Sequence, residues 1–277
     1  MMTIGIIARL TFRETQRRRL LWIGVLMSLG FLLVFGLGFH FIYIDISKAM
    51  SGPETQIPLL FLTLAGMYAT NLMVIMVAIL ISVTTISGEV ETHTIESLLA
   101  KPIRRWQLIA GKWLGYAVII LGFVLFLPGG VLVIVYLRSG FTLENIPLGL
   151  ALIYLGGLIG LSVSIAGGTR LSTLANGALA FMLFGIAFIG GWVEQIGAMF
   201  QNETAVDVGI LASLLLPTEI LWKKATTLFS PNIGSGFQFA GPFTVISQPS
   251  SLMIIYSIIY VFALLGLAIL LFSQRDL

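Results

Sequence analysis

The sequence predicts an all-α integral membrane protein with six transmembrane helices, and two observations lead to this fold class. Hydrophobic residues make up 58% of the 277 residues and charged residues only 10%, whereas soluble proteins carry roughly a quarter charged residues. The chain also contains six apolar runs, and each is long enough to cross a bilayer, which needs about 20 residues. We therefore expect a single transmembrane domain over residues 1–277 rather than a water-soluble fold.

The expected spans follow from the long runs without charged residues. Five arginines precede the first run, but this run is too long for the core of a signal peptide and lacks a small-residue cleavage site, so we expect it to remain as an anchor. Pro128 lies in the third run and is a candidate for a kink. The six spans are 20–44, 59–86, 113–137, 147–168, 171–192 and 251–272.

Positive charges divide unevenly between the two faces. If the N-terminus is cytoplasmic, the outer face carries only Lys48, Arg138, Lys223 and Lys224. Cytoplasmic loops of membrane proteins are enriched in Lys and Arg, so we expect both termini in the cytoplasm and residues 193–250 as an outer region. The inner face then carries Arg9, Arg13, Arg17, Arg18, Arg19, Lys101, Arg104, Arg105, Lys112, Arg170 and Arg275.

The six expected spans contain no Asp, Glu, Lys or Arg. Ion-coupled carriers and proton pumps usually keep ionisable groups at membrane depth, because these groups carry the coupling. We therefore expect the energy for any transport by this protein to come from elsewhere.

In the outer region, residues 206–216 form an apolar stretch that is too short to cross a membrane and is closed by Pro217. This predicts a re-entrant or interfacial helix. The region could gate a pathway, bind an extracytoplasmic partner or cap the bundle. In the fourth span, Gly156 and Gly160 have the spacing of close helix packing, either within one subunit or at a dimer seam.

The loop between the second and third spans is the longest polar segment on the inner face. On a helix, Glu89, His93 and Glu96 share one face, and Pro102 ends the helix. Residues 95, 98 and 99 form an apolar patch. This predicts a short amphipathic helix at the membrane surface. It is either a solvated connector or a docking element for a cytoplasmic partner.

At this loop the sequence resembles the permeases of type-2 ATP-binding-cassette (ABC) transporters. In that family the loop reads as an acidic pair, Thr–Ile/Leu–Glu, Leu–Leu, a proline, an arginine and then Gly–Lys. The layout of the whole chain is similar too, from the Arg-rich start to the large outer region before the last span. The matching positions are Glu89, Glu91, Thr94, Ile95, Glu96, Leu98, Leu99, Pro102, Arg105, Gly111 and Lys112.

The resemblance implies that this loop is a coupling helix, which docks on a separate ATPase subunit and transmits ATP-driven closure to the spans. It also implies two ATPase copies, a second permease subunit that is identical or different, and location in the cell (plasma) membrane, as in a bacterial or archaeal inner membrane. Residues 3–19 would be an interfacial helix that meets membrane lipid with Arg9, Arg13 and Arg17. Alternatively, these residues are only a basic segment that flanks the first span.

The resemblance thus predicts a transport subunit that couples ATP hydrolysis by a partner to translocation of a substrate, in most such permeases by export. One branch of similar size supports maturation of nitrous oxide reductase, a copper enzyme, and remains an alternative. A scaffold that transports nothing, or an ATP-independent channel, remains open because hydropathy cannot exclude it. The substrate and the residues that bind it are unassigned.

Several chemistries are not expected in this chain. It has no G-x-x-x-x-G-K-[ST] phosphate loop, so we expect ATP and Mg²⁺ to bind in the partner ATPase and no cofactor to bind here. With two histidines, no cysteine and no H-E-x-x-H motif, neither a catalytic nor a metal site is expected. The net charge of +3 is too small to indicate a nucleic-acid partner.

Overall fold

The computed structural model of the chain describes residues 2–50, 52–91, 104–230, 245 and 249–274, and these ranges contain helices and no strand. Within these ranges, six helices are long and apolar enough to cross a membrane, which confirms the predicted fold class and agrees with the six expected spans. They are α2 (Arg19–Ala49), α3 (Gln56–Ser82), α6 (Arg105–Ser139), α7 (Ile146–Gly168), α8 (Thr173–Met199) and α11 (Leu252–Ser273). The shorter elements are α1 (Met2–Arg17), η1 (Gly52–Thr55), α4 (Ser87–Glu91), α9 (Glu203–Leu215) and α10 (Thr218–Phe229).

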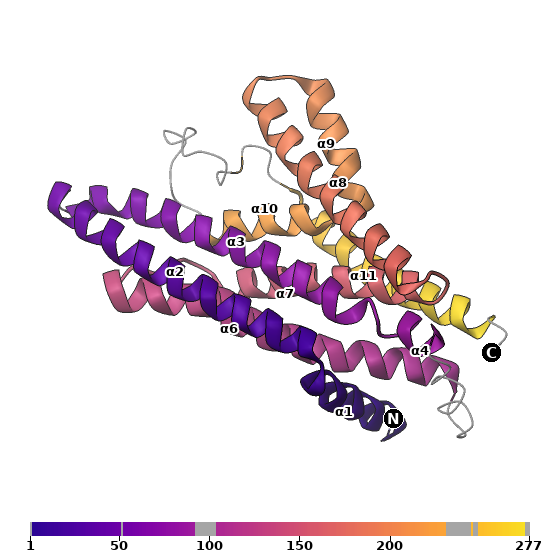
Figure 1. Cartoon of the computed structure of the whole chain (residues 1–277). Coiled ribbons are helices and arrows are strands. Elements are labelled where there is room, and N and C mark those ends of the chain that lie inside the picture. Colours follow the sequence, from indigo (N-terminus) through magenta and orange to yellow (C-terminus); the bar gives the residue numbers. More distant parts are fainter. Residues whose placement is uncertain (1, 51, 92–103, 231–244, 246–248, 275–277) are drawn as a thin grey trace.

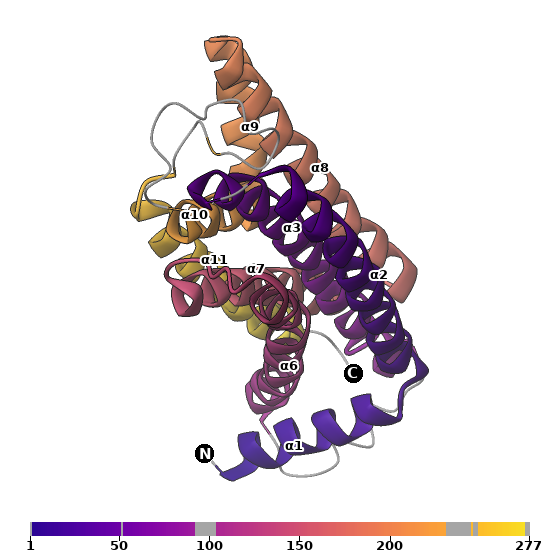
Figure 2. The ribbon, with the colours of Figure 1, turned by 90° about the vertical axis from the view of Figure 1, so that its left-hand side faces the viewer.

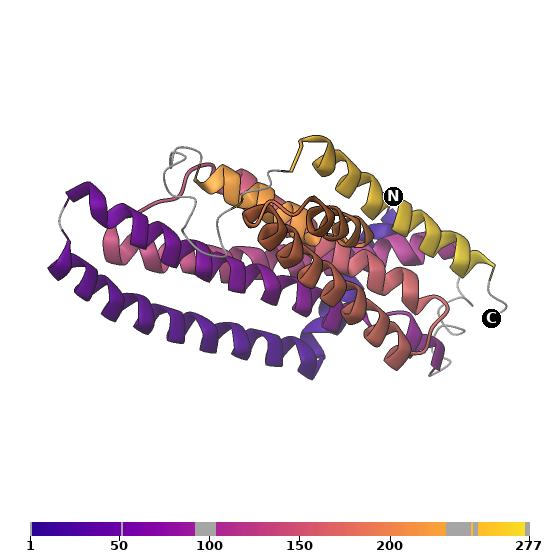
Figure 3. The same ribbon diagram turned by 90° about the horizontal axis from the view of Figure 1, so that it is seen from above.

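Helices α2, α3, α6 and α7 run along the length of the bundle, and α8 and α9 form a hairpin that projects away from it (Figure 1). Seen from above, α2 and α3 lie side by side, and α11 lies on the far side of the bundle from α2 (Figure 3). Helix α1 lies across the end of α6 (Figure 2). The end of the bundle that holds α1, α4, the start of α6 and the end of α11 is called the terminal end below.

Local sequence explains where the third span ends and how closely α2 approaches it. Gly140 adopts a left-handed φ of 70° directly after α6, and glycine is the residue that best tolerates this helix-ending conformation. Pro128 does not end α6, which continues as a helix to Ser139. A Cβ atom on Gly130 would lie 2.9 Å from Leu32, so this glycine lets α2 approach α6 closely.

The centre of the bundle is formed by α3 and α7, whose apolar side chains are mostly buried. A Cβ atom on Gly157 would lie 2.7 Å from Ile120, and one on Gly160 would lie 3.3 Å from Ile79. The small residues of α7 therefore let α6 and α3 pack closely against it. The close packing predicted at Gly156 to Gly160 thus forms inside this chain.

The expected short helix at residues 206–216 corresponds to α9, and a sharp bend of 107° separates α9 from α10. Helix α10 turns back along α7. The Glu144 amide donates to the Phe229 carbonyl at 3.2 Å, and the Asn145 side chain donates to the Leu228 carbonyl at 3.2 Å. The segment expected on the outer face therefore includes a helix that is buried against a membrane span.

Candidate functional site

The predicted docking loop is partly described by the structure. Glu89 and Glu91 lie in α4, and Arg105 begins α6. The other predicted docking residues, Thr94, Ile95, Glu96, Leu98, Leu99 and Pro102, lie outside the described residues.

Helix α4 is held to its neighbours by polar contacts. Ser87 donates its hydroxyl to the Val83 carbonyl at 2.7 Å, and Thr173, the first residue of α8, donates to the Ser87 hydroxyl at 3.0 Å. The buried Asn176 side chain donates to Val83 at 3.2 Å and to the Ser164 carbonyl of α7 at 2.8 Å. The start of the docking loop is therefore fixed to three of the long helices, α3, α7 and α8.

Lys112 makes the strongest of these attachments. Its ammonium group forms an ion pair with the Glu89 carboxylate, and the side chains of Lys112 and Glu89 are only 6% and 13% exposed. The same ammonium group donates to the Thr85 carbonyl at 3.1 Å. Because a pair this well shielded from water is weakly screened, it fixes α4 to α6. The Glu89 carboxylate thus faces the membrane domain.

Two arginines connect further helices at the terminal end. Arg18, between α1 and α2, donates to the Thr84 hydroxyl at 2.6 Å and pairs with Glu14 at 2.5 Å. Arg105 donates to the carbonyls of Phe272 and Ser273, at 3.2 and 3.0 Å, at the end of α11. Helices α1, α2, α3, α6 and α11 therefore meet around the segment that leads into the docking loop.

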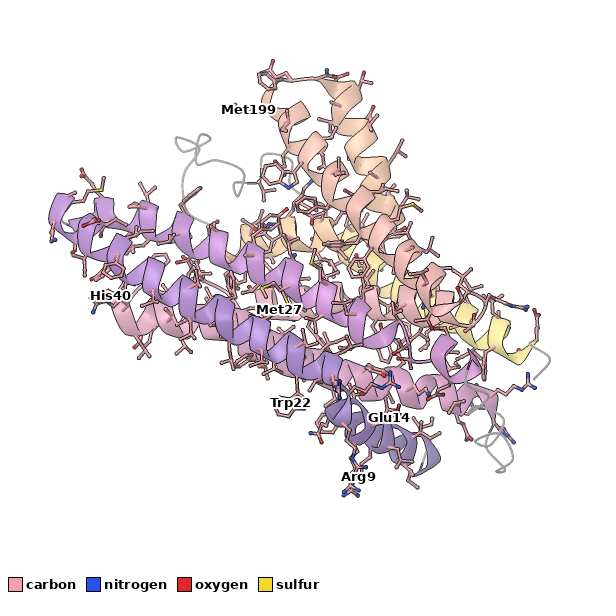
Figure 4. The ribbon with its side chains drawn as sticks, in the orientation of Figure 1. Arg9, Glu14, Trp22, Met27, His40 and Met199 are labelled. Atoms are coloured by element: carbon pink, nitrogen blue, oxygen red, sulfur yellow. The ribbon has the colours of Figure 1, made fainter. Side chains whose placement is uncertain are left out.

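Helix α1 has one face packed on α6 and another that is exposed. Ile7, Thr11 and Thr15 are buried at a spacing of four residues, and Ile7 and Thr11 lie over Gly111 and Gly115. The predicted membrane-contact residues, Arg9, Arg13 and Arg17, are exposed on α1. Arg9 points away from the bundle (Figure 4). Exposed Ile6 precedes these arginines in sequence and exposed Leu10 follows Arg9, a pattern typical of a helix in a membrane interface.

Replacing Gly111 by leucine is expected to lower the thermal stability of the protein and to release α1 from α6. A Cβ atom on Gly111 would lie 2.7 Å from Ile7, and overpacking of this kind costs about 1–3 kcal/mol. Gly122 on the same helix has no neighbouring atom within 4 Å of an added Cβ, so Gly122→Leu is the matched control. Equal melting temperatures for the two variants would contradict the close packing of α1.

A second group of charged side chains is buried where α8, α10 and α3 meet. Lys223 of α10 lies 2.6 Å from Glu194 of α8, and these side chains are 4% and 6% exposed. Glu219, one turn before Lys223, is also buried and interacts electrostatically with both of them. Trp192 donates its ring N–H to the Tyr68 hydroxyl at 3.0 Å beside this group. We call Glu194, Glu219 and Lys223 the interior charge cluster.

The interior charge cluster was not predicted from the sequence. Glu194 follows the expected end of the fifth span, and Glu219 and Lys223 were placed in the outer region. Tyr68, which interacts electrostatically with Glu219, lies near the middle of α3. Helix α8 extends beyond the expected end of the fifth span at residue 192 to Met199 and so includes Glu194. The physical reason is that Lys223 compensates the Glu194 charge inside the protein.

Comparison with known proteins adds one finding. The family model described as ABC-2 family transporter protein matches residues 6–277, from α1 to beyond α11. No curated protein matches the chain. Among the described residues, no group of three or more His, Asp or Glu side chains is placed to hold a metal ion.

Proposed function

Since the chain belongs to the ABC-2 family of transporter proteins, we propose that it exports a substrate across the plasma membrane of a bacterium or archaeon. The family match and the six apolar helices support a multi-pass membrane subunit for transport. In this proposal an ABC ATPase in a separate chain hydrolyses the ATP. In the proposed complex, two copies of that ATPase bind ATP and Mg²⁺ in the cytoplasm. A second permease subunit, identical or different, completes the pathway.

The observation that supports a coupling role is the set of contacts at the terminal end. The segment between α3 and the docking loop makes three side-chain contacts with other helices. Lys112 connects it to α6, Arg18 connects it to the start of α2, and Thr173 connects it to α8. Packed interfaces with buried ion pairs move as units rather than deforming continuously. A displacement of the loop by the ATPase would therefore be passed to several spans at once.

The loop residues divide into two roles in this proposal. Glu89 acts as an anchor, because its carboxylate is paired with Lys112 inside the membrane domain. Arg105 is a second anchor, since it holds the end of α11. The residues proposed to contact the ATPase are Glu91, Thr94, Ile95, Glu96, Leu98, Leu99 and Pro102.

Helix α1 would lie in the inner membrane interface in the same complex. Its exposed arginines would meet lipid phosphates while Ile6 and Leu10 enter the acyl region. Since α1 also packs on Gly111 and Gly115, it would support α6 next to Lys112. In this proposal both termini lie in the cytoplasm, as expected from the charge distribution.

Charge reversal of Glu91 and Glu96 together is expected to weaken co-purification of the ATPase and to lower its permease-dependent ATP turnover at least about tenfold, which corresponds to about 1.4 kcal/mol. The protein would be co-expressed with its ABC ATPase and captured by a tag on the permease. Glu203→Lys, at the exposed start of α9, is the control for added positive charge. Unchanged capture and turnover in the double variant would contradict the docking role.

A further inference from the structure

The interior charge cluster has no part in docking, because it lies at the junction of α8, α10 and α3 and not at the terminal end. Ionisable side chains inside a membrane domain are costly, and those that occur there usually serve a function. The cluster contains two carboxyl groups and one ammonium group. The question is therefore how the second carboxyl group is compensated.

Lys223 is paired with Glu194, because its ammonium nitrogen lies 2.6 Å from the Glu194 carboxylate. Glu219 is 3% exposed, and its Oε1 atom has no hydrogen-bond partner among the described residues. A buried carboxylate that has an unpaired oxygen and no cation of its own is less favourable than a neutral carboxylic acid. The charge balance of the cluster therefore favours one bound proton in addition to the Lys223–Glu194 pair.

Within the part of the chain that the structure describes, the groups that face Glu219 do not supply a second cation. Helix α3 contributes Tyr68, α8 contributes Glu194, and α10 itself contributes Lys223. The neighbouring Lys224 is directed elsewhere, with its ammonium group 3.4 Å from the Pro249 carbonyl. The tyrosines of the other packed helices donate to backbone carbonyls: Tyr154 to Ala117, Tyr256 to Leu214, and Tyr260 to Leu215.

The space beside Glu219 limits the size of a ligand. Glu219 lies against Gly191 of α8, where an added Cβ atom would be 3.0 Å from the Glu219 Cγ atom and 3.3 Å from its Oε2 atom. The Glu219 side chain thus lies close to α8 at Gly191, with no room between them for an added methyl group. On that side, nothing larger than a proton can bind while α8 and α10 stay packed.

We propose that Glu219 is a proton-binding site inside the membrane domain and that the packing of α8 against α10 keeps the proton bound. When the two helices separate, water reaches the cluster and the Lys223–Glu194 pair is hydrated. The Glu219 O–H bond then breaks, the proton passes to water and the carboxylate remains. When the helices pack again, Glu219 takes up one proton.

The arrangement of the chain suits such a movement. Helix α10 is fixed to α7 at its far end by the hydrogen bonds from Glu144 and Asn145. Helix α8 carries the projecting α8–α9 hairpin, whose two helices pack through Gly190 and Gly209 (Figure 1). The interior charge cluster lies where this hairpin joins the bundle. A movement of the hairpin relative to the bundle would therefore open or close the proton site.

Infrared spectroscopy of the purified protein in lipid nanodiscs tests the proton site without the ATPase. The wild type is expected to show, at neutral pH, the C=O stretching band of a protonated carboxylic acid. Glu219→Gln is expected to remove this band, whereas Glu203→Gln, at an exposed position on α9, keeps it. A wild type without the band at neutral pH, or an unchanged band in Glu219→Gln, would overturn the proposal.

Folding of two neutral variants gives a further check, because Gln and Met resemble a neutral glutamic acid in size. Both Glu219→Gln and Glu219→Met are expected to fold, and failure of both would contradict a neutral Glu219.

The role of packing is tested with Gly191→Leu, which is expected to push α10 away and abolish the infrared band. Gly185→Leu, where an added Cβ meets no atom within 4 Å, should keep it. Retention of the band in a folded Gly191→Leu protein would refute the role of packing.

Discussion

Replacing Lys223 by methionine is expected to lower the free energy of unfolding by about 3–5 kcal/mol, the usual loss when one partner of a buried ion pair is removed. Lys223 and Glu194 are almost inaccessible to water, with 4% and 6% of their side chains exposed. The variant leaves the Glu194 carboxylate without a cation in the interior. Chemical or thermal unfolding in nanodiscs measures the loss.

The loss of stability in Lys223→Met is limited by protonation of Glu194, and it should therefore depend on pH. The variant can protonate Glu194 instead of keeping a bare charge. At neutral pH, protonation of Glu194 costs about 1.4 kcal/mol for each unit by which the pH exceeds the ordinary glutamate pKa of about 4.3. The loss in Lys223→Met is therefore expected to shrink as the pH is lowered towards that value, because the unfolded chain then binds the same proton.

The neighbouring residues provide the controls for Lys223. Lys224→Met removes the adjacent, half-buried lysine and is expected to change stability by less than about 1 kcal/mol. Glu194→Gln should cost less than Lys223→Met, since Lys223 keeps Glu219 as a partner. The double variant Glu194→Gln, Lys223→Met should recover most of the loss. Equal losses in the two lysine variants would contradict a buried pair at Lys223.

The comparison of sequence and structure shows why the spans were predictable and the interior charge cluster was not. A span is a local property, since about 20 consecutive apolar residues suffice to identify it. The Lys223–Glu194 pair joins residues that are far apart in sequence, and no local pattern reports it. Glu194 was therefore expected in the outer region just beyond the fifth span, although α8 continues to Met199. The spacing of Glu219 and Lys223 on one helical face was the one available signal.

The contacts of the docking loop were also not predictable from local sequence. The motif contained both Glu89 and Lys112, but helical spacing placed Glu89 on a face with Glu96 and gave no reason to pair it with Lys112. The pair forms because α6 starts beside the end of α3, so that Lys112 also reaches the Thr85 carbonyl. The basic flank at residues 3–19 was ambiguous for a related reason. Its burial at Ile7 depends on Gly111, more than a hundred residues later.

Replacing Lys112 by methionine is expected to reduce permease-dependent ATP turnover and transport by more than about tenfold. The change removes the ion pair to Glu89 and the hydrogen bond to Thr85, which together attach the docking loop to α6. It also leaves the Glu89 carboxylate poorly hydrated and unpaired, so the free energy of unfolding should fall by several kcal/mol. ATP turnover by the co-expressed complex and unfolding of the permease alone measure the two effects separately.

A second variant separates stability from coupling at Lys112. The double variant Glu89→Gln, Lys112→Met carries no unpaired charge, so its stability should return close to that of the wild type. Its coupling should remain low, because a neutral pair no longer ties the loop strongly to α6. Lys48→Met, at an exposed position near the end of α2, is the control for loss of a lysine. Full coupling in the stable double variant would show that the force from the ATPase reaches the spans by another route, of which the Arg18–Thr84 contact is the next candidate.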